Sequence, residues 1–278
     1  MLERGFGTMA RALEAAGFES AWVGDHVAMP RENASRYPFT ASGEMPWSPT
    51  EPWSDSVVVM ATMAEATSTI RIGAGVMVAA LRNPVVLAKQ LATIDVLSGG
   101  RLELGVGAGW LTEEFTIVGL GAGARGRRLD EVIEVVRRCW EGSPDAFDGA
   151  FYSLPEGALF YPVPLHDVPV LIGGMSERAY ERVVRLGAGW VGTTSVTQLQ
   201  PGALDPITRI RRIATAHGRD PEELSFVVRV HTGGEADVER LVEVVPALAR
   251  GGVTELVVDI PWAQGVDLVE WYERLKGA

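Results

Sequence analysis

An acid and an imidazole stand side by side where a predicted strand ends. The run ESAWVGDHV (19–27) places three apolar residues ahead of Gly24, and Asp25 and His26 follow as the chain leaves the core. A histidine exchanges protons near neutral pH, so an imidazole at this position is suited to acid–base chemistry. The alternative is that Asp25 caps the next turn and His26 is an ordinary surface residue. We predict that His26 is a proton carrier, held by Asp25 or by a backbone group.

Glycines gather at three other predicted strand ends: GAG at 73–75, GVGAG at 105–109 and GG at 173–174. Strand ends without side chains would leave an open slot, and a flat polycyclic ring would fit it. A sugar or amino-acid substrate would instead require polar side chains at several of these places. The glycine series therefore favours a ring-shaped ligand.

The junction LIGGMSERAYERV (171–183) has the features of a phosphate site. Gly173 and Gly174 let the backbone approach a ligand, and Ser176 is a good N-cap for the amphipathic helix that follows. Free N–H groups and the helix dipole favour an anion there. The alternative is a tight strand-to-helix turn that needs glycines for steric reasons alone, and the spacing leaves both open.

Strand-like and helix-like runs alternate along the whole chain, which predicts a parallel sheet covered by helices. The regular alternation is typical of a (β/α)8 TIM barrel formed as a single domain by residues 1–278. The chain opens directly in the helical run TMARALEAAGF, so the usual first strand is missing. A truncated start and an unusual closure of the barrel are both open. The strand-like runs span residues 19–27, 69–78, 101–109, 168–175, 189–194, 224–232 and 255–261.

In a barrel the C-terminal strand ends converge, and active sites lie on that face. Two long insertions, at about residues 28–52 and 143–168, are candidate lids; the first is rich in aromatic residues and follows the Asp25–His26 strand. The insertion at 143–168 is typical of a hairpin or flap and is long enough to reach across the top. Arg229 and His231 alternate along a strand, so both can face the barrel interior and contact a ligand, and the last strand end brings Asp259. The residues that we expect to contact a cofactor are Gly75, Val76, Met77, Ala108, Gly109, Trp110, Gly173, Gly174, Met175, Ser176 and Thr193.

Composition excludes several classes of protein. A formal net charge of -11 argues against non-specific nucleic-acid binding, and no apolar run approaches the ~20 residues of a membrane span. The single cysteine, Cys139, rules out an internal disulfide and a multi-cysteine metal site, and it lies on the apolar stripe of a helix. The four histidines lack metal-binding spacing. We predict a cytoplasmic protein that acts on a small molecule without a metal.

The sequence resembles the bacterial-luciferase-like superfamily. The resemblance rests on GFESAWVGDHVAMP (17–30), IRIGAGVMVAALRNPVVLAKQLATIDVLSGGRLELGVGAGWLTEEF (70–115), RGRRLDEVIEVVRRCWEG (125–142) and PVLIGGMS (169–176). It covers about residues 12–195 and is closest to the branch of coenzyme F420-dependent oxidoreductases. The family fold is a (β/α)8 barrel, and its members normally begin with a strand, so this chain departs from the family there.

The resemblance implies a flavin or deazaflavin ring across the barrel mouth. Gly75-Val76 matches a position where relatives carry a non-proline cis peptide behind the ring. Asp25 and His26 match a pair near the reactive carbon of the deazaflavin. The loop containing Gly173, Gly174 and Ser176 matches a phosphate-binding position, and Ala108 and Gly109 match backbone that contacts the ring.

One departure bears on the substrate. Trp110 stands where sugar-phosphate-oxidising relatives carry a glutamate proposed as proton donor, and Glu113 and Glu114, one turn later, need not reach the ring. We therefore predict an F420-dependent oxidoreductase acting on a small, weakly polar substrate. The family also implies a homodimer and a separate reductase that supplies reduced cofactor. The alternatives are a two-component monooxygenase using reduced FMN and oxygen, a non-catalytic flavin-binding or interaction protein, and, more weakly, a phosphate-binding lyase or isomerase.

Overall fold

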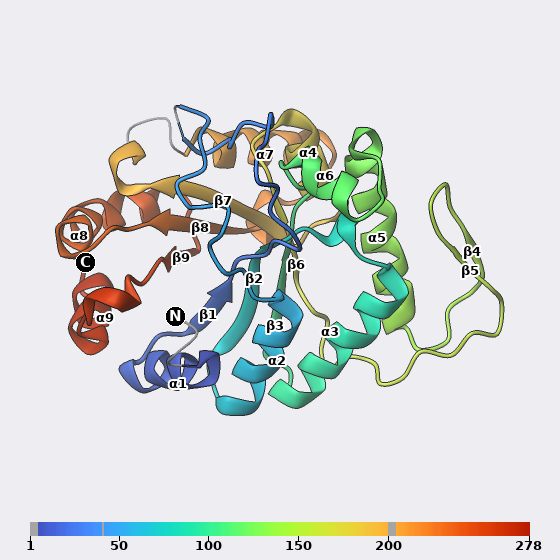
Figure 1. The fold of residues 1–278 in the computed structure, drawn as a ribbon, viewed down its shortest axis with the longest axis horizontal. Helices are drawn as coiled ribbons and strands as arrows, with labels where there is room; N and C mark the ends of the chain where they lie inside the picture. The colour runs from blue at the N-terminus through green and yellow to red at the C-terminus, as the bar shows by residue number, and fades with distance from the viewer. Residues whose placement is uncertain (1–4, 41, 200–203) are drawn as a thin grey trace.

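A computed structural model describes residues 5–40, 42–199 and 204–278. Seven parallel strands form one curved sheet in the order β1-β2-β3-β6-β7-β8-β9, and helices cover its outer face (Figure 1). The predicted α/β barrel architecture is confirmed. The strands are β1 (Ser20–Val23), β2 (Arg71–Met77), β3 (Leu102–Val106), β6 (Val170–Gly173), β7 (Gly189–Ser195), β8 (Ser225–His231) and β9 (Glu255–Val258).

Each strand of the sheet follows a helix in the chain, as the alternation of the sequence predicts. The helices are α1 (Phe6–Ala16), α2 (Ser56–Ala66), α3 (Pro84–Ser98), the short α4 (Thr112–Ile117), α5 (Arg125–Trp140), α6 (Glu177–Leu186), α7 (Asp205–Ala216), α8 (Glu235–Arg250) and α9 (Leu268–Lys276). The strands are shorter than the predicted runs, except β7, which is one residue longer. Because β1 ends at Val23, Asp25 and His26 lie in the loop beyond it.

Local sequence explains where the helices begin and end. Asn83 caps α3 by accepting hydrogen bonds from the N–H groups of Val85 and Val86, and Pro84 occupies the first turn, where no N–H is needed. Gly99 ends the same helix with a φ of 71°, in the left-handed region that glycine adopts without strain. Asp55 caps α2 through Val57 and Val58. These caps thus fix the residues at which α2 and α3 begin and at which α3 ends.

Two apolar layers fill the fold. One lies between the sheet and the helices and includes Cys139 on α5, which is 2% exposed. Burial raises the pKa of the Cys139 thiol to about 11. The other layer lies inside the barrel, where Trp22 and Val76 pack with residues of four further strands or their ends: Leu171, Ala188, Val191, Val227 and Val257.

The barrel is not closed by backbone pairing. Strand β1 pairs only with β2 and β9 only with β8 among the described residues. We call the gap between Ser20–Val23 and Glu255–Val258 the seam. Side chains bridge it at one end, where the Glu255 carboxylate accepts hydrogen bonds from the Ser20 hydroxyl and the Trp22 indole N–H. Among the described residues, the sheet is therefore open between β1 and β9.

The two insertions lie in different places. Residues 28–52, which we call the lid, contain no helix or strand among their described positions and join β1 to α2. Residues 143–168 contain an antiparallel hairpin of β4 (Phe147–Asp148) and β5 (Ser153–Leu154), as predicted. This hairpin lies outside α5 and does not cross the barrel mouth (Figure 1). The reason is its anchor: the Glu131 carboxylate on α5 accepts hydrogen bonds from the backbone of residues 150–152.

Candidate active site

The imidazole of His26 is held by a buried glutamate. His26 is 8% exposed, and its Nδ1 lies 3.1 Å from Oε2 of Glu114, which is 1% exposed and belongs to α4. The other oxygen of Glu114 accepts hydrogen bonds from the backbone N–H groups of Val27 at 2.5 Å and Ala28 at 3.2 Å. One carboxylate therefore fixes both the ring and the start of the lid. Because Nδ1 is used, Nε2 is the nitrogen left for a ligand.

The Asp25 carboxylate binds Arg82 and not His26. Its carboxylate forms a bidentate pair with Arg82 at 2.7 Å for both bonds, and it accepts hydrogen bonds from the Ser56 hydroxyl and the Val78 N–H, each at 2.8 Å. Burial works to lower the pKa of Arg82, but Asp25 outweighs it and holds that pKa above its usual value. The expectation that Asp25 or a backbone group holds His26 is thus wrong, since the partner of its Nδ1 is the Glu114 carboxylate. The oxygens of Asp25 turn toward the start of α2, which brings Ser56, and toward the segment that follows β2, which brings Val78 and Arg82.

Aromatic rings surround His26. The ring centroids of Trp53, Trp110 and Trp47 lie 4.8, 6.0 and 6.1 Å from that of His26. Tyr37 of the lid packs edge-on against Trp47 at 5.0 Å and Trp110 at 5.2 Å. Burial raises the pKa of Tyr37 to about 12, so its hydroxyl stays protonated at neutral pH. We call Tyr37, Trp47, Trp53 and Trp110 the aromatic enclosure.

Two orphaned donors lie in this enclosure. The indole N–H groups of Trp47 and Trp53 are buried and have no hydrogen-bond acceptor among the described residues. A buried donor without a partner is costly, so such groups commonly mark a site completed by water or a ligand. An oxygen-bearing ligand would supply the acceptor.

The glycine-rich strand ends do not leave the open slot that the sequence predicts. A Cβ atom on Gly107 or on Gly173 would lie 2.8 Å from a methyl group of Val76, and one on Gly73 would lie 2.6 Å from the Trp22 ring. These glycines therefore make room for neighbouring side chains inside the barrel. The Gly75–Val76 peptide is cis, as the resemblance implies, and places Val76 between β3 and β6. The Val76 side chain occupies the space beside Gly107 and Gly173.

A second group of predicted residues lies around β6 and β7. Met175 and Thr193 line a cavity of about 340 Å³ whose other wall includes Pro38 and Phe39 of the lid. Gly174 has a φ of 130°, and the Ser176 hydroxyl accepts a hydrogen bond from the Ala179 N–H at 3.3 Å, which confirms the predicted N-cap of α6. Met175, which lines this cavity, thus directly precedes the N-cap of α6.

The remaining residues that we expected to contact a cofactor lie in different surroundings. Met77 is fully buried among the helices and does not reach the mouth. The Gly109 carbonyl accepts a hydrogen bond from Arg125, and Ala108 is half-buried against the outer core. Trp110 turns toward His26 in the aromatic enclosure.

A charged cluster faces the same end of the barrel from β8 and β9. Arg229 donates two hydrogen bonds to Asp259, at 2.8 and 3.1 Å, and a third to the Gly75 carbonyl at 3.2 Å. His231 Nδ1 lies 2.5 Å from Asp259, and its Nε2 is buried without a partner among the described residues. Burial works to raise the pKa of Asp259, but the bonds from His231 and Arg229 outweigh it and lower this pKa to about 2.

Sequence reasoning missed Glu114 as the partner of His26. The two residues are 88 positions apart, and an acidic residue in the first turn of a helix is commonly explained by the helix dipole alone. The available signal was the pair Glu113–Glu114 directly after the GVGAGW strand end. Both glutamates anchor the lid, since Glu113 accepts hydrogen bonds from the N–H groups of Ala34 and Ser35. Among the described residues, no group of three or more metal-ligating side chains gathers, and no helix has the length and apolarity to span a membrane.

The sequence profile of the family described as luciferase-like monooxygenase matches residues 4–273, so the chain belongs to this family. A protein of Mycobacterium tuberculosis (strain ATCC 25618 / H37Rv) of uncharacterized function is 30% identical over 262 residues, which cover 93% of this chain and 86% of that protein. The F420-dependent glucose-6-phosphate dehydrogenase of Mycolicibacterium fortuitum is 30% identical over 241 residues, or 84% of this chain and 66% of the dehydrogenase.

Solved structures share the fold. An F420-dependent secondary alcohol dehydrogenase in complex with an F420-acetone adduct superimposes with a TM-score of 0.72 at 19% identity, covering 91% of this chain and 87% of its own. The monooxygenase RslO1 from Streptomyces bottropensis gives a TM-score of 0.70 at 19% identity, with 99% and 95% covered.

Proposed function

We propose that the protein is an F420-dependent oxidoreductase that transfers hydride between reduced deazaflavin and a small, weakly polar carbonyl or unsaturated compound. The observation that carries the proposal is the His26–Glu114 pair inside the aromatic enclosure. The similarity to F420-dependent dehydrogenases supports the choice of cofactor. The apolar enclosure around the proton carrier supports the choice of substrate.

The residues present fit such a cofactor. Val76 offers an apolar surface to the ring, and the cavity lined by Met175 and Thr193 leads to the capped N-terminus of α6. Backbone N–H groups at a helix N-terminus would hold a phosphate of the cofactor tail. A deazaflavin bound in this way supplies the hydride.

The protein's own residues supply the proton and the orientation. In the direction of reduction, His26 gives a proton from Nε2 to the substrate oxygen as hydride reaches the neighbouring carbon; the reverse reaction returns both. Glu114 keeps the imidazole in place through Nδ1. The indole N–H groups of Trp47 and Trp53 are donors for the same oxygen, and the lid excludes water.

An anaerobic titration with F420 beside an identical one with FMN tests the cofactor. We expect F420 to bind at micromolar or lower concentration and FMN much more weakly. The variant His26→Gln should bind F420 as the wild type does and lose about 100-fold or more in kcat, the contribution usual for a positioned general acid. Full turnover by this variant would overturn the proton-carrier role. Weak F420 binding by the wild type would overturn the cofactor assignment.

A flavin-dependent monooxygenase is the second candidate, favoured by the structural similarity to RslO1 over 99% of this chain. Tight binding of FMN, with oxygen consumption that depends on reduced FMN, would select it. Homodimerisation, a separate reductase and a cytoplasmic location belong to the main proposal. Light scattering coupled to size-exclusion chromatography tests the first of these.

A further inference from the structure

The first turn of α4 is capped by a residue of the lid. Leu111 occupies the N-cap position of this helix, and its side chain makes no capping hydrogen bond. The Ser35 hydroxyl instead accepts a hydrogen bond from the Thr112 N–H at 3.1 Å. A serine oxygen on a free N–H group of the first turn is the kind of contact that an N-cap residue provides. Because this serine lies 77 positions away in the chain, the start of α4 depends on the lid.

Helix α4 in turn holds the lid at the same place. The Glu113 carboxylate accepts hydrogen bonds from the N–H groups of Ala34 at 2.7 Å and Ser35 at 3.1 Å, and the Ser35 and Thr112 hydroxyls lie 2.8 Å apart. Burial works to raise the pKa of Glu113, but the hydrogen bonds from Ser35 and Ala34 outweigh it and lower this pKa to about 2. The carboxylate is therefore ionised at neutral pH. We call Ala34, Ser35, Thr112 and Glu113 the latch.

The latch contacts the turn that carries Glu114. This residue directly follows Glu113, and its carboxylate holds both the His26 imidazole and the start of the lid. Helix α4 has six residues, and a helix of this length gains little stability from its own hydrogen bonds. Leu111 and Phe115 are fully buried and keep α4 on the core. What the latch adds is the position of the turn between these two residues.

We propose that Ser35 is a positioning residue for the proton carrier: through the latch it sets the first turn of α4, and thereby the Glu114 carboxylate and the direction of His26 Nε2. The role of His26 as proton carrier rests on the proposed function. The lid is tied to one turn of α4 at two places, at residues 27–28 through Glu114 and at residues 34–35 through the latch. When residues 34 and 35 leave α4, the imidazole loses its fixed direction. The proton carrier is therefore complete only while this part of the lid lies on α4.

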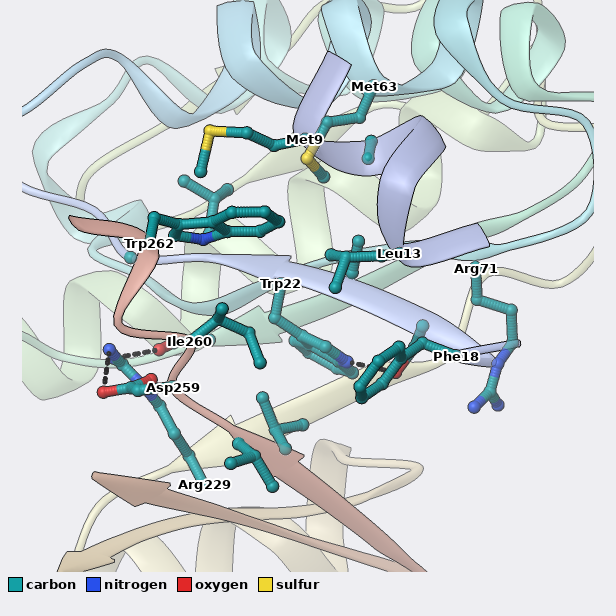
Figure 2. Close-up of a pocket in the computed structure, with 18 of the residues that line it drawn as sticks. Met9, Leu13, Phe18, Trp22, Met63, Arg71, Arg229, Asp259, Ile260 and Trp262 are labelled. Carbon is teal, nitrogen blue, oxygen red and sulfur yellow. Dashed lines mark hydrogen bonds and ion pairs between the residues drawn. The ribbon is translucent and has the colours of Figure 1, made fainter. Parts of the chain in front are cut away.

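The second charged cluster of the barrel mouth serves as an internal reference. Figure 2 shows Arg229 paired with Asp259 where both line the cavity at the seam. The further side-chain bonds of this pair go to His231 on β8 and to the Gly75 carbonyl, and the Asp259 N–H donates to the Val230 carbonyl. Among the described residues, no hydrogen bond joins the lid to this cluster. Loss of the latch should therefore leave the cluster unchanged.

The test replaces the Ser35 hydroxyl. Ser35→Ala removes the cap and keeps both N–H donors to Glu113, whereas Ser35→Thr keeps a hydroxyl. Ser48→Ala is the matched control, because Ser48 is an exposed lid serine whose hydroxyl contacts Thr50 within the lid. In the protein without ligands, we expect Ser35→Ala to raise amide exchange about fivefold in residues 112–117 and 26–28, the size that loss of a cap predicts. Ser35→Thr and Ser48→Ala should exchange as the wild type does, and the Asp259 amide should not change.

The imidazole of His26 gives a readout that a purely structural role would not alter. Its hydrogen bond to Glu114 keeps the neutral ring in the tautomer with the proton on Nδ1. Long-range 1H–15N NMR correlations of the histidine rings should show this one tautomer in the wild type and in Ser35→Thr, and a mixture of both tautomers in Ser35→Ala. The variant His26→Gln identifies the signal.

Three outcomes would overturn the proposal. The first is a single His26 tautomer in Ser35→Ala, which would make the latch a local contact of the lid. The second is unchanged exchange in residues 112–117 of Ser35→Ala. The third is faster exchange that includes the Asp259 amide or persists in Ser35→Thr, which would indicate a general loss of stability. Because these measurements need neither cofactor nor substrate, failure of the F420 proposal would leave the test of Ser35 intact.

Discussion

The Glu114 carboxylate contacts the imidazole with one oxygen and, with the other, the N–H groups of Val27 and Ala28 where the lid begins. A variant that keeps the contacts with the N–H groups and loses the charge beside the imidazole separates the two roles of Glu114. Glu114→Gln retains an amide oxygen for Val27 and Ala28 but removes the charge beside His26. We expect kcat to fall about tenfold or more while the Kd for F420 changes less than about twofold, because positioning of the proton carrier is lost and not the binding surface. Measured turnover and fluorescence titration give the two numbers.

The outcome that contradicts this role is a parallel loss of kcat and cofactor affinity, which would indicate a collapse of the lid. Glu51→Gln is the control, since Glu51 is an exposed lid residue whose side chain makes no hydrogen bond among the described residues.

Asp259 gives a prediction for pH. Its folded-state pKa of about 2 lies below the ordinary value of 3.8, so its ion pairs stabilise the fold fully above about pH 4. That contribution, on the order of 2 kcal/mol, is lost as pH falls from about 4 toward 2. Urea unfolding of the wild type and Asp259→Asn should therefore differ at pH 5 and converge near pH 2. A difference that stays constant with pH would place the stabilisation elsewhere.

At the level of elements, the close approach of β2, β3 and β6 depends on glycine. A Cβ on Gly173 would lie 2.8 Å from Cγ1 of Val76, so Gly173→Ala should lower the free energy of unfolding by about 1–3 kcal/mol through overpacking. The same Cβ would lie 3.5 Å from Cβ of Val76, an ordinary contact. Val76→Ala in the same chain should therefore recover most of the loss. A double-mutant cycle by chemical denaturation measures the coupling, and strict additivity of the two changes would contradict it.

The sequence predicted elements better than the contacts between them. Alternating runs were enough to place the strands of the sheet and the longer helices, because burial in a parallel sheet leaves a continuous apolar signature in each strand. The short helix α4, which carries Glu114, was not predicted. The glycines at 105–109 and 173–174 could not be interpreted as readily, since a glycine that admits a ligand and one that admits Val76 are identical in the sequence. The sequence also favours pairing Asp25 with its neighbour His26, because contacts between residues far apart in the chain leave no local pattern. Its partners Arg82 and Ser56 lie further along the chain.

Over the whole molecule, stability is unevenly distributed around the barrel. Strands β3 and β6 pair on both sides and are covered by helices, whereas β1 and β9 each pair on one side. We expect amides of β1 and β9 to exchange with solvent about 100-fold or more faster than those of β3 and β6, because opening at an edge breaks fewer contacts. Native-state hydrogen exchange with mass spectrometry measures this order. Uniform protection around the sheet would contradict it.

The seam also explains why the sequence could not decide how the barrel closes. The helical run that precedes β1 carries no information on how the two edges of the sheet meet. Whether Ser20 and Glu255 meet through backbone or through side chains depends on the curvature of the whole sheet, which no local pattern records. In the structure the two edges meet through side chains, since the Ser20 hydroxyl donates a hydrogen bond to the Glu255 carboxylate.

The single cysteine makes motions of the lid accessible to spectroscopy. Cys139 is buried on α5, and a thiol with a pKa of about 11 exposes almost no thiolate to a labelling reagent at neutral pH. A cysteine introduced on the lid would consequently be the one reactive position, without any need to remove the native residue. A fluorophore attached there would report lid opening and closing during turnover, because Cys139 would carry no label.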